Sequence, residues 1–323
     1  MFRSNAVSRR RQRRNRVRGA VISGEHLEAR TLLTAYVVNT IEDGSLVSDG
    51  FVSLREAIEA ANTNAAFLDA AAGEAGPGAT DTIVFDPILN GQTITLGGTS
   101  LVISDSLMIS DNNALPVSID AAGNSRVFDV VSGSGLVSIA NVTIAGGSDV
   151  VGGGIRVAGG ESLVLDAVTV RGNTATGNSS TEGGGGLFND GGDVTITNST
   201  ITANSASGTS GSGGGIFSTS GSVSIAASTI SLNSATRAGG GIELISGDAL
   251  LTAVNLINND VDGTAGAANP GNGGGVHISG AAAYTMDGGS VFGNRAAREG
   301  GGLWNGSGLM TIQNGTLIQA NEA

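Results

Sequence analysis

Six residues that could contact a ligand follow one recurring phrase of the sequence, three glycines and an aliphatic residue. If each phrase opens a β-strand with its aliphatic residue turned inward, the next residue faces outward. The six residues are Arg156, Phe188, Phe217, Glu243, His277 and Trp304. Three are aromatic, and exposed aromatic rings in a row suit sugar rings or an apolar protein surface. Two outcomes are open: variable loops fold over this face and bury it, or these positions form a candidate binding stripe.

The same residues offer little for catalysis. A glycosidase needs two close carboxylates, and Glu243 is the stripe's only acid; the other acids considered are Glu161, Asp166, Asp190 and Asp193. His277 is the only histidine of the repeats, and no GxSxG motif accompanies it. We therefore expect no catalytic residue and no cofactor. A polysaccharide lyase or hydrolase is the alternative, and a purely structural surface spacer is a third possibility.

A metal site is also not expected. The calcium-binding repeat GGxGxDx places Asp after the glycines, where this chain has Ile, Leu or Val, and its nine-residue period is missing. The fragment Asp260-Val261-Asp262-Gly263 resembles part of a calcium loop but lacks the distal bidentate glutamate. An ordinary turn is expected there. The chain contains no cysteine, so disulfides and thiolate metal sites are excluded.

The elements that must position the stripe are the coils of a repeat. Each aliphatic anchor is followed 17 or 18 residues later by an asparagine, whereas 9 to 17 residues separate that asparagine from the next anchor. Strands of constant length beside one variable loop are typical of stacked parallel strands. The anchors are Ile155, Leu187, Ile216, Ile242, Val276 and Leu303. The asparagines are Asn173, Asn204, Asn233, Asn259, Asn294 and Asn321.

This self-similarity predicts an all-β fold, a right-handed parallel β-helix. The anchors should stack inward, and the asparagines should lie at a bend and hydrogen-bond to the equivalent asparagine of the next coil. One β-helix domain is expected over residues 36–323. Residues 36–80 form an N-terminal cap and loop, 81–150 irregular coils without the glycine phrase, and 151–323 the repeat coils. Six marked coils and roughly three unmarked coils are expected.

The cap is expected to contain a short helix. Ser53-Leu54-Arg55-Glu56 has the spacing of a capping box, and apolar residues then recur at helical intervals through Ala61. A helix laid across the end of a solenoid covers strand edges that would otherwise be unpaired. Val52–Ile58, read as VSLREAI, resembles the CSLREAI motif of bacterial β-helix surface proteins, with Val52 in place of its cysteine.

Charge separates the first residues from the rest. Eight of the 16 basic residues, all arginines, lie in residues 1–18, while residues 19–323 carry a net charge of −20. An acidic body argues against nucleic-acid binding by the fold, and no stretch is long and apolar enough for a transmembrane helix. Leu27–Ala35 resembles the LEPR-x-LL-S-A motif of exported bacterial proteins, with Ala29 replacing Pro and Thr34 replacing Ser. This resemblance implies that residues 1–35 are an Arg-rich export and sorting segment.

The repeats themselves resemble those of polymorphic outer-membrane proteins, whose signatures are GGA-aliphatic and FxxN. Here Gly replaces the Ala, and an aliphatic residue replaces the Phe. The resemblance implies an exported or cell-surface, adhesin-like protein that contacts glycans or other surface proteins. Because the last repeat ends at Asn321, we expect either a longer native chain or end-to-end stacking.

Overall fold

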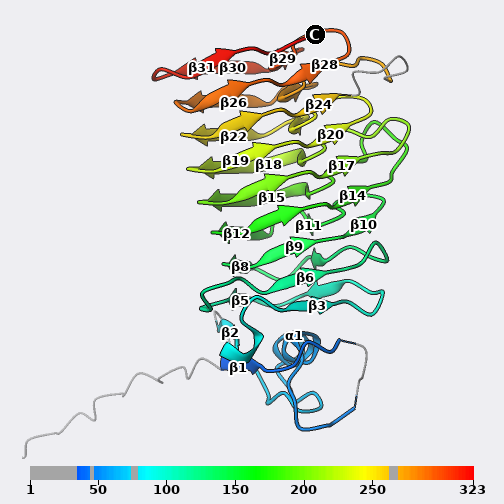
Figure 1. The fold of residues 1–323 in the computed structure, drawn as a ribbon, viewed down its shortest axis with the longest axis vertical. Coiled ribbons are helices and arrows are strands. Elements are labelled where there is room, and N and C mark those ends of the chain that lie inside the picture. Colours follow the sequence, from blue (N-terminus) through cyan, green and yellow to red (C-terminus); the bar gives the residue numbers. More distant parts are fainter. Residues whose placement is uncertain (1–34, 44–46, 74–78, 262–267) are drawn as a thin grey trace, which may run out of the picture. The chain divides into compact units, whose positions relative to one another are not determined.

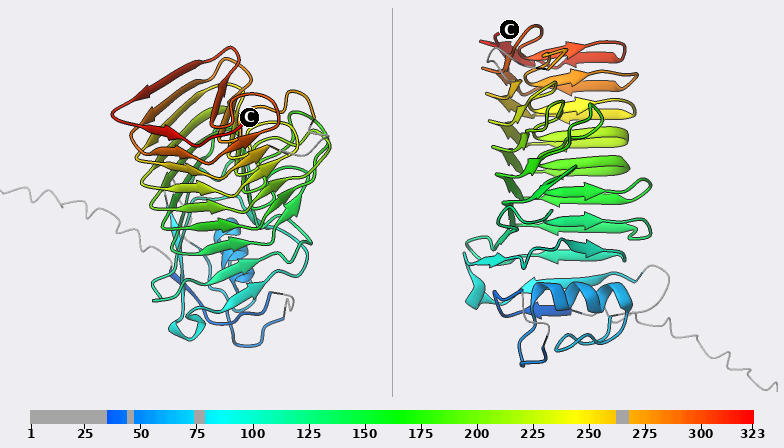
Figure 2. Two further views of the ribbon diagram at one scale, coloured as in Figure 1. Left: turned by 45° about the horizontal axis from the view of Figure 1, so that its top comes forward. Right: turned by 90° about the vertical axis from the view of Figure 1, so that its right-hand side faces the viewer.

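A computed structural model describes residues 35–43, 47–73, 79–261 and 268–323. The predicted sorting segment therefore lies outside the described residues, apart from Ala35. Within them, parallel strands coil around one axis and stack on each other, with one α-helix at the N-terminal end of the stack (Figures 1 and 2). This arrangement confirms the parallel β-helix predicted from the repeats.

The largest sheet has sixteen strands and carries the anchors along one part of its width. The anchor strands are β4 (Leu101–Ile103), β7 (Phe128–Val130), β11 (Ile155–Val157), β15 (Leu187–Thr197), β18 (Ile216–Ala226), β21 (Ile242–Leu244), β25 (Val276–Ile278) and β29 (Leu303–Asn305). The long strands β15 and β18 extend across both parts of the sheet, so the two parts are continuous.

The other part of this sheet extends further toward the N-terminus. Besides the second halves of β15 and β18, it contains β1 (Ala35–Val38), β2 (Asp81–Phe85), β5 (Leu107–Ser110), β8 (Leu136–Ala140), β12 (Ser162–Asp166), β22 (Asp248–Thr252), β26 (Ala283–Asp287) and β30 (Leu309–Gln313). Each pairs in parallel with its neighbours, as a helical coil of strands requires.

A second sheet contributes one strand to each of nine coils, which matches the expected six marked and three unmarked coils. Its strands are β3 (Thr93–Thr95), β6 (Ser118–Asp120), β9 (Thr143–Ala145), β13 (Thr169–Arg171), β16 (Thr200–Thr202), β19 (Thr229–Ser231), β23 (Asn255–Ile257), β27 (Ser290–Phe292) and β31 (Leu317–Gln319). The central residue of these strands is buried from β3 through β27 and exposed in β31.

A third sheet is made of six strands of two residues each. They are β10 (Ser148–Asp149), β14 (Thr174–Ala175), β17 (Ser205–Ala206), β20 (Ser234–Ala235), β24 (Asp260–Val261) and β28 (Arg295–Ala296). Each strand follows the asparagine position of its coil or its equivalent, and the variable arc of the repeat begins directly after it.

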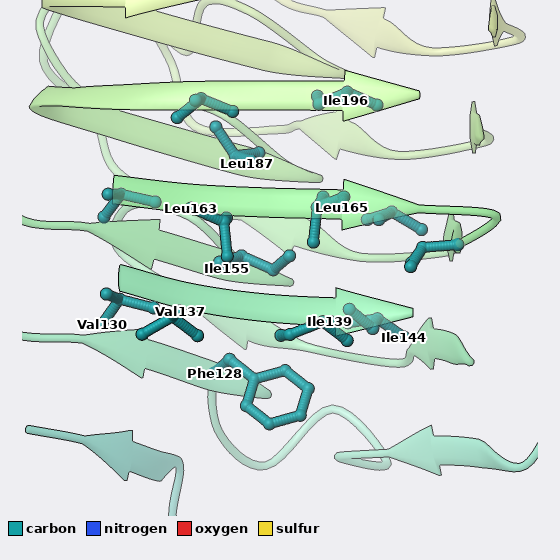
Figure 3. Packing of buried hydrophobic residues seen from close by; sticks show 14 of the residues in the cluster. Phe128, Val130, Val137, Ile139, Ile144, Ile155, Leu163, Leu165, Leu187 and Ile196 are labelled. Atoms are coloured by element: carbon teal, nitrogen blue, oxygen red, sulfur yellow. The ribbon is translucent and has the colours of Figure 1, made fainter. Parts of the chain in front are cut away.

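The core is the stack of aliphatic side chains inside the coil (Figure 3). Ile155 pairs in register with Leu187, which pairs with Ile216, and all three are fully buried. Burying such a side chain contributes about 1.5–3 kcal/mol. The column of inward anchors that the repeat predicts is therefore present, and it fixes the register of every residue beside it.

The N-terminal end of the stack is closed by helix α1 (Leu54–Thr63). Ser53 Oγ accepts a hydrogen bond from the Glu56 backbone N–H, and the Glu56 carboxylate accepts from the Ser53 N–H, as the capping box predicts. Arg55 pairs with the Asp43 carboxylate and also donates to the carbonyl oxygens of Thr99 and Ser100. These contacts attach the helix to the first coils of the solenoid.

Candidate functional site

The six predicted stripe residues lie in one column. Strand pairing places Arg156 beside Phe188, Phe188 beside Phe217, Phe217 beside Glu243, Glu243 beside His277, and His277 beside Trp304. We call this set the anchor-adjacent column. Its residues lie about 4.8 Å apart along the solenoid, the spacing of neighbouring strands.

The outward exposure expected for this column is wrong for its four central residues. Phe188 is 6% exposed, Phe217 and Glu243 are fully buried, and His277 is 1% exposed. Arg156 and Trp304, at the two ends, are partly exposed. The burial that the alternative expectation predicts is present at these four residues, although that expectation assigns it to the variable loops.

The first glycine of each phrase packs closely against this column. The first glycine of each triplet has a positive φ, +62° at Gly213, and turns the chain back over the residue that follows the anchor. A Cβ at Gly213 would lie only 2.9 Å from Phe217 Cβ and would collide with the carbonyl oxygen of Ile216. Gly is therefore required here both for its backbone conformation and for the space that the column residue occupies.

Inside the column, neighbouring residues contact each other. The rings of Phe188 and Phe217 stack with centroids 5.4 Å apart and planes 13° from parallel. The rings of His277 and Trp304 stack at 4.4 Å and 5°. The indole N–H of Trp304 donates to Glu299 at 3.0 Å, which fixes the outer ring of this pair.

Glu243 is held by three neighbours. One carboxylate oxygen is hydrogen-bonded to His277 Nδ1 at 2.8 Å, and the other accepts from Ser279 Oγ at 2.6 Å and lies 3.8 Å from the Arg237 guanidinium. A carboxylate that is fully buried needs such partners because its desolvation is costly. Because both carboxylate oxygens have partners within the protein, Glu243 connects neighbouring side chains of the coil.

Arg156 extends the column into an ion-pair chain. Its guanidinium lies 3.1 Å from the carboxylate of Asp129, its neighbour in the preceding coil. Asp129 is also 3.2 Å from Arg126, which in turn is 3.3 Å from Asp149. This end of the column is therefore neutralised within the protein.

The six asparagines form the predicted ladder. The side-chain amide of each of the first five donates to Oδ1 of the next at 2.9–3.0 Å, running from Asn173 to Asn321. The backbone N–H of each donates to the same oxygen, at 3.0 Å for Asn204 to Asn233. The five asparagines that donate are at most 1% exposed. The third glycine of the triplet packs on this ladder, since a Cβ at Gly215 would lie 3.1 Å from the Asn233 amide.

The acids considered for catalysis also have structural partners. Glu161 accepts hydrogen bonds from the backbone N–H groups of Gly133 and Gly135. Asp166 accepts from Thr197 and Asn198, and the hydrogen bond from the Thr197 hydroxyl chiefly holds the pKa of the Asp166 carboxyl below its usual value. Hydrogen bonds to the charged form favour ionisation.

Other acids lie elsewhere on the coils. Asp193 accepts from Ser222 Oγ at 2.6 Å, and Asp190 lies at the register shift between β15 and β18. The described parts of the chain contain no group of three or more His, Cys, Asp or Glu residues placed to hold a metal ion. The second aspartate of the calcium-loop fragment, Asp262, and Gly263 lie outside the described residues.

A concave polar surface lies on the sheet of two-residue strands. Its outward residues are in register from coil to coil: Ser148, Thr174, Ser205, Ser234, Asp260 and Arg295. We call the first five of them the hydroxyl face. Two hollows lie along it. One of about 220 Å³ is lined by Ser205, Ser234 and Asp260 together with residues beside them, and one of about 590 Å³ by residues that include Ser148 and Thr176.

The hydroxyl face is not among the features predicted from the sequence, although a signal for it exists. The residue directly after the ladder asparagine is Thr174, Ser205 and Ser234 in three successive repeats, and Asp260 in the next. Two-residue strands are too short to show the alternation by which strand faces are recognised. Only the ladder, which fixes the position before it in every coil, identifies these residues as equivalent.

Among the described residues, no helix has the length and apolar character needed to cross a membrane. No protein-family model, curated protein or solved structure matches this chain.

Proposed function

We propose that this protein is an exported, non-catalytic contact module that presents its outer faces to glycans or to proteins of a cell surface. The observation that carries the proposal is the in-register stacking of equivalent side chains over successive coils. A surface with a constant repeat of about 4.8 Å is suited to partners that are themselves extended or repetitive.

Export rests on the N-terminal resemblances. The Arg-rich start, the Leu27–Ala35 motif and the Val52–Ile58 motif each resemble segments of exported bacterial proteins. The GGG-aliphatic repeat resembles repeats of polymorphic outer-membrane proteins, which are surface adhesins or passengers of exported proteins. These resemblances support placement outside the cell and an adhesin-like role.

The absence of catalysis is supported by the positions of the ionisable groups. Glu243 has both oxygens occupied inside the coil, and Glu161 caps two backbone N–H groups. A general acid or base must reach the substrate proton that it transfers. Glu243 and Glu161 instead bond to their own fold.

The test is retention without turnover. The purified chain is incubated with immobilised neutral and anionic polysaccharides and with whole bacterial cells, and bound protein and released reducing sugar are measured together. We expect retention on at least one surface with no released product, and a heat-unfolded sample serves as the control. Release of product would establish an enzyme, and retention on none of the surfaces would favour a purely structural spacer.

A further inference from the structure

We infer that the hydroxyl face binds a neutral polysaccharide whose chain lies along the solenoid axis. The inference deepens the proposed function, on which it rests, by naming both the surface and the chemical class of the ligand. It arises from the row of hydroxyls on the third sheet, from the two hollows beside that row, and from the charge of the protein.

The face offers polar groups at a constant interval. Ser148, Thr174, Ser205 and Ser234 present one hydroxyl per coil, and Asp260 presents a carboxylate in the next, at a separation of about 4.8 Å. Ser234 Oγ donates to Ser205 Oγ at 3.1 Å, which shows that neighbouring hydroxyls of the row point toward each other. A row of hydroxyls can both donate to and accept from the hydroxyls of successive sugar rings.

Each hollow also contains one buried polar atom without a hydrogen-bond partner. These atoms are Asp260 Oδ1 in the smaller hollow and Ser125 Oγ in the larger. Neither atom is accessible at the surface of its hollow, so among the described residues they are unpaired groups of the interior that a bound sugar does not contact.

Charge decides between neutral and anionic chains. Asp149 pairs with Arg126 and Asp260 lies beside Arg295 in the next strand, so the local acids are partly balanced, but residues 19–323 carry a net charge of −20. A field of this sign repels an acidic polymer and leaves a neutral one unaffected. The ligand class is therefore a neutral polysaccharide.

The lining also favours a sugar over a peptide. The residues around the smaller hollow are Ser, Thr, Ala and Asp, and those around the larger include Gly, Ser, Thr and Asn. Peptide recognition depends on large apolar or aromatic side chains seated in pockets. These hollows are shallow and polar, and hydroxyl groups match them better than such anchors do.

The experiment introduces larger side chains on the hydroxyl face and leaves the net charge of the protein unchanged. In the variant Ser205→Gln/Ser234→Gln, two long neutral side chains occupy the smaller hollow. The matched control, Thr200→Gln/Thr229→Gln, makes the same change on β16 and β19 of the same two coils, where the side chains are equally part-buried and lie on the second sheet. Circular dichroism and thermal unfolding verify that both variants fold.

Binding is measured by isothermal titration calorimetry with a soluble glucan, mannan and xylan, and with polygalacturonate as the anionic polymer. We expect the wild type and the Thr200/Thr229 control to bind at least one neutral polysaccharide equally. The Ser205/Ser234 variant should bind about tenfold more weakly or not at all, and Asp260→Asn should bind several-fold more weakly. None should bind polygalacturonate more tightly than the neutral chains.

Two results would overturn the inference, and they differ in what they mean for the proposed function. Equal binding by the Ser205/Ser234 variant and its control would move the glycan site to another face and leave a contact module in place. Absence of wild-type binding to all three neutral polysaccharides would reject the hydroxyl face as a site for them. The proposed function would then depend on retention by whole cells or by the anionic polymers alone.

Discussion

The irregular coils of residues 81–150 and the repeat coils of residues 151–323 build one continuous core by different means at their bends. In the irregular coils, Asp111 accepts from the N–H groups of Asn113 and Val117 at the bend between the large sheet and the second sheet. In the repeat coils, the asparagine ladder lies at the bend between the second and third sheets and connects each such bend to the next. Strand pairing crosses the boundary without interruption, from β8 to β12 and from β9 to β13.

This difference distinguishes the residues that form each coil from the residues that make successive coils alike in sequence. Both regions bury aliphatic side chains at equivalent positions, such as Ile144 and Val170. The asparagine and glycine signature therefore reports how a bend is stabilised, whereas the inward aliphatic residue determines the coil. Changes at the bends should accordingly affect the two regions to different extents.

The largest effect is expected in the middle of the ladder. Asn233→Ala removes the acceptor of two Asn204 donors, and it also leaves Ile201 O and Asn259 Oδ1 without the Asn233 amide. At about 1–3 kcal/mol for each buried polar group left unpaired, we expect a loss of about 4 kcal/mol. Asp111→Ala, at a bend of the irregular coils that has no ladder, frees two N–H groups and should cost about 2 kcal/mol.

Urea unfolding followed by circular dichroism measures both losses. Equal destabilisation by Asn233→Ala and Asp111→Ala would show that the ladder does not couple its bends, and that the two regions are held in the same way.

A smaller effect is expected at the glycines. Gly213→Ala combines a φ of +62° with a collision at the Ile216 carbonyl oxygen, and it should destabilise by about 3 kcal/mol. Gly133 in the irregular coils has a φ of +96° with no atom near the added Cβ, so Gly133→Ala should cost only about 1 kcal/mol. Thermal unfolding of the two variants tests whether the repeat glycines are required for space as well as for conformation. Similar melting temperatures would leave conformation as the sole reason.

The smallest expected effect is a pH dependence of stability at Asp166. Its carboxylate titrates, whereas the amide introduced by Asp166→Asn does not. The pKa of Asp166 is lowered from 3.8 by hydrogen bonds from Thr197 and Asn198, so its ionised form is favoured in the folded state. This contribution is present above pH 3.8 and is lost as the pH falls through the lower folded-state value. Asp166→Asn should therefore reduce the melting temperature slightly at pH 6 and leave a smaller difference from wild type at pH 3. A difference that is unchanged between these pH values would contradict the assignment.

Much of the fold could be predicted because stacking makes equivalent residues recur. Ile155 and Leu187, like Asn173 and Asn204, occupy the same place in consecutive coils, so their spacing alone identifies an inward column and a ladder. The capping box at Ser53 is a local signal that needs no tertiary information. These features depend on strands and bends of constant length.

The candidate site could be predicted only in part. The register of Phe188, Phe217 and Glu243 follows from the anchors, but their burial does not. Strand alternation predicts exposure, and the close packing of the first glycine against this column depends on the direction that the chain takes at a positive φ. The hydrogen bond between Glu243 and Ser279 joins residues in different coils, separated by an arc of variable length. No periodic pattern encodes such a contact.

The arc that follows the hydroxyl face has a consequence for how such proteins diversify. It is the part of the repeat whose length varies, and each arc begins where a two-residue strand ends. Insertions in this arc change the chain that borders the hydroxyl face. The stacked strands and their buried side chains stay unchanged, since surface loops tolerate added residues at little cost. The outline of this surface can therefore change while the core of the solenoid keeps its stability.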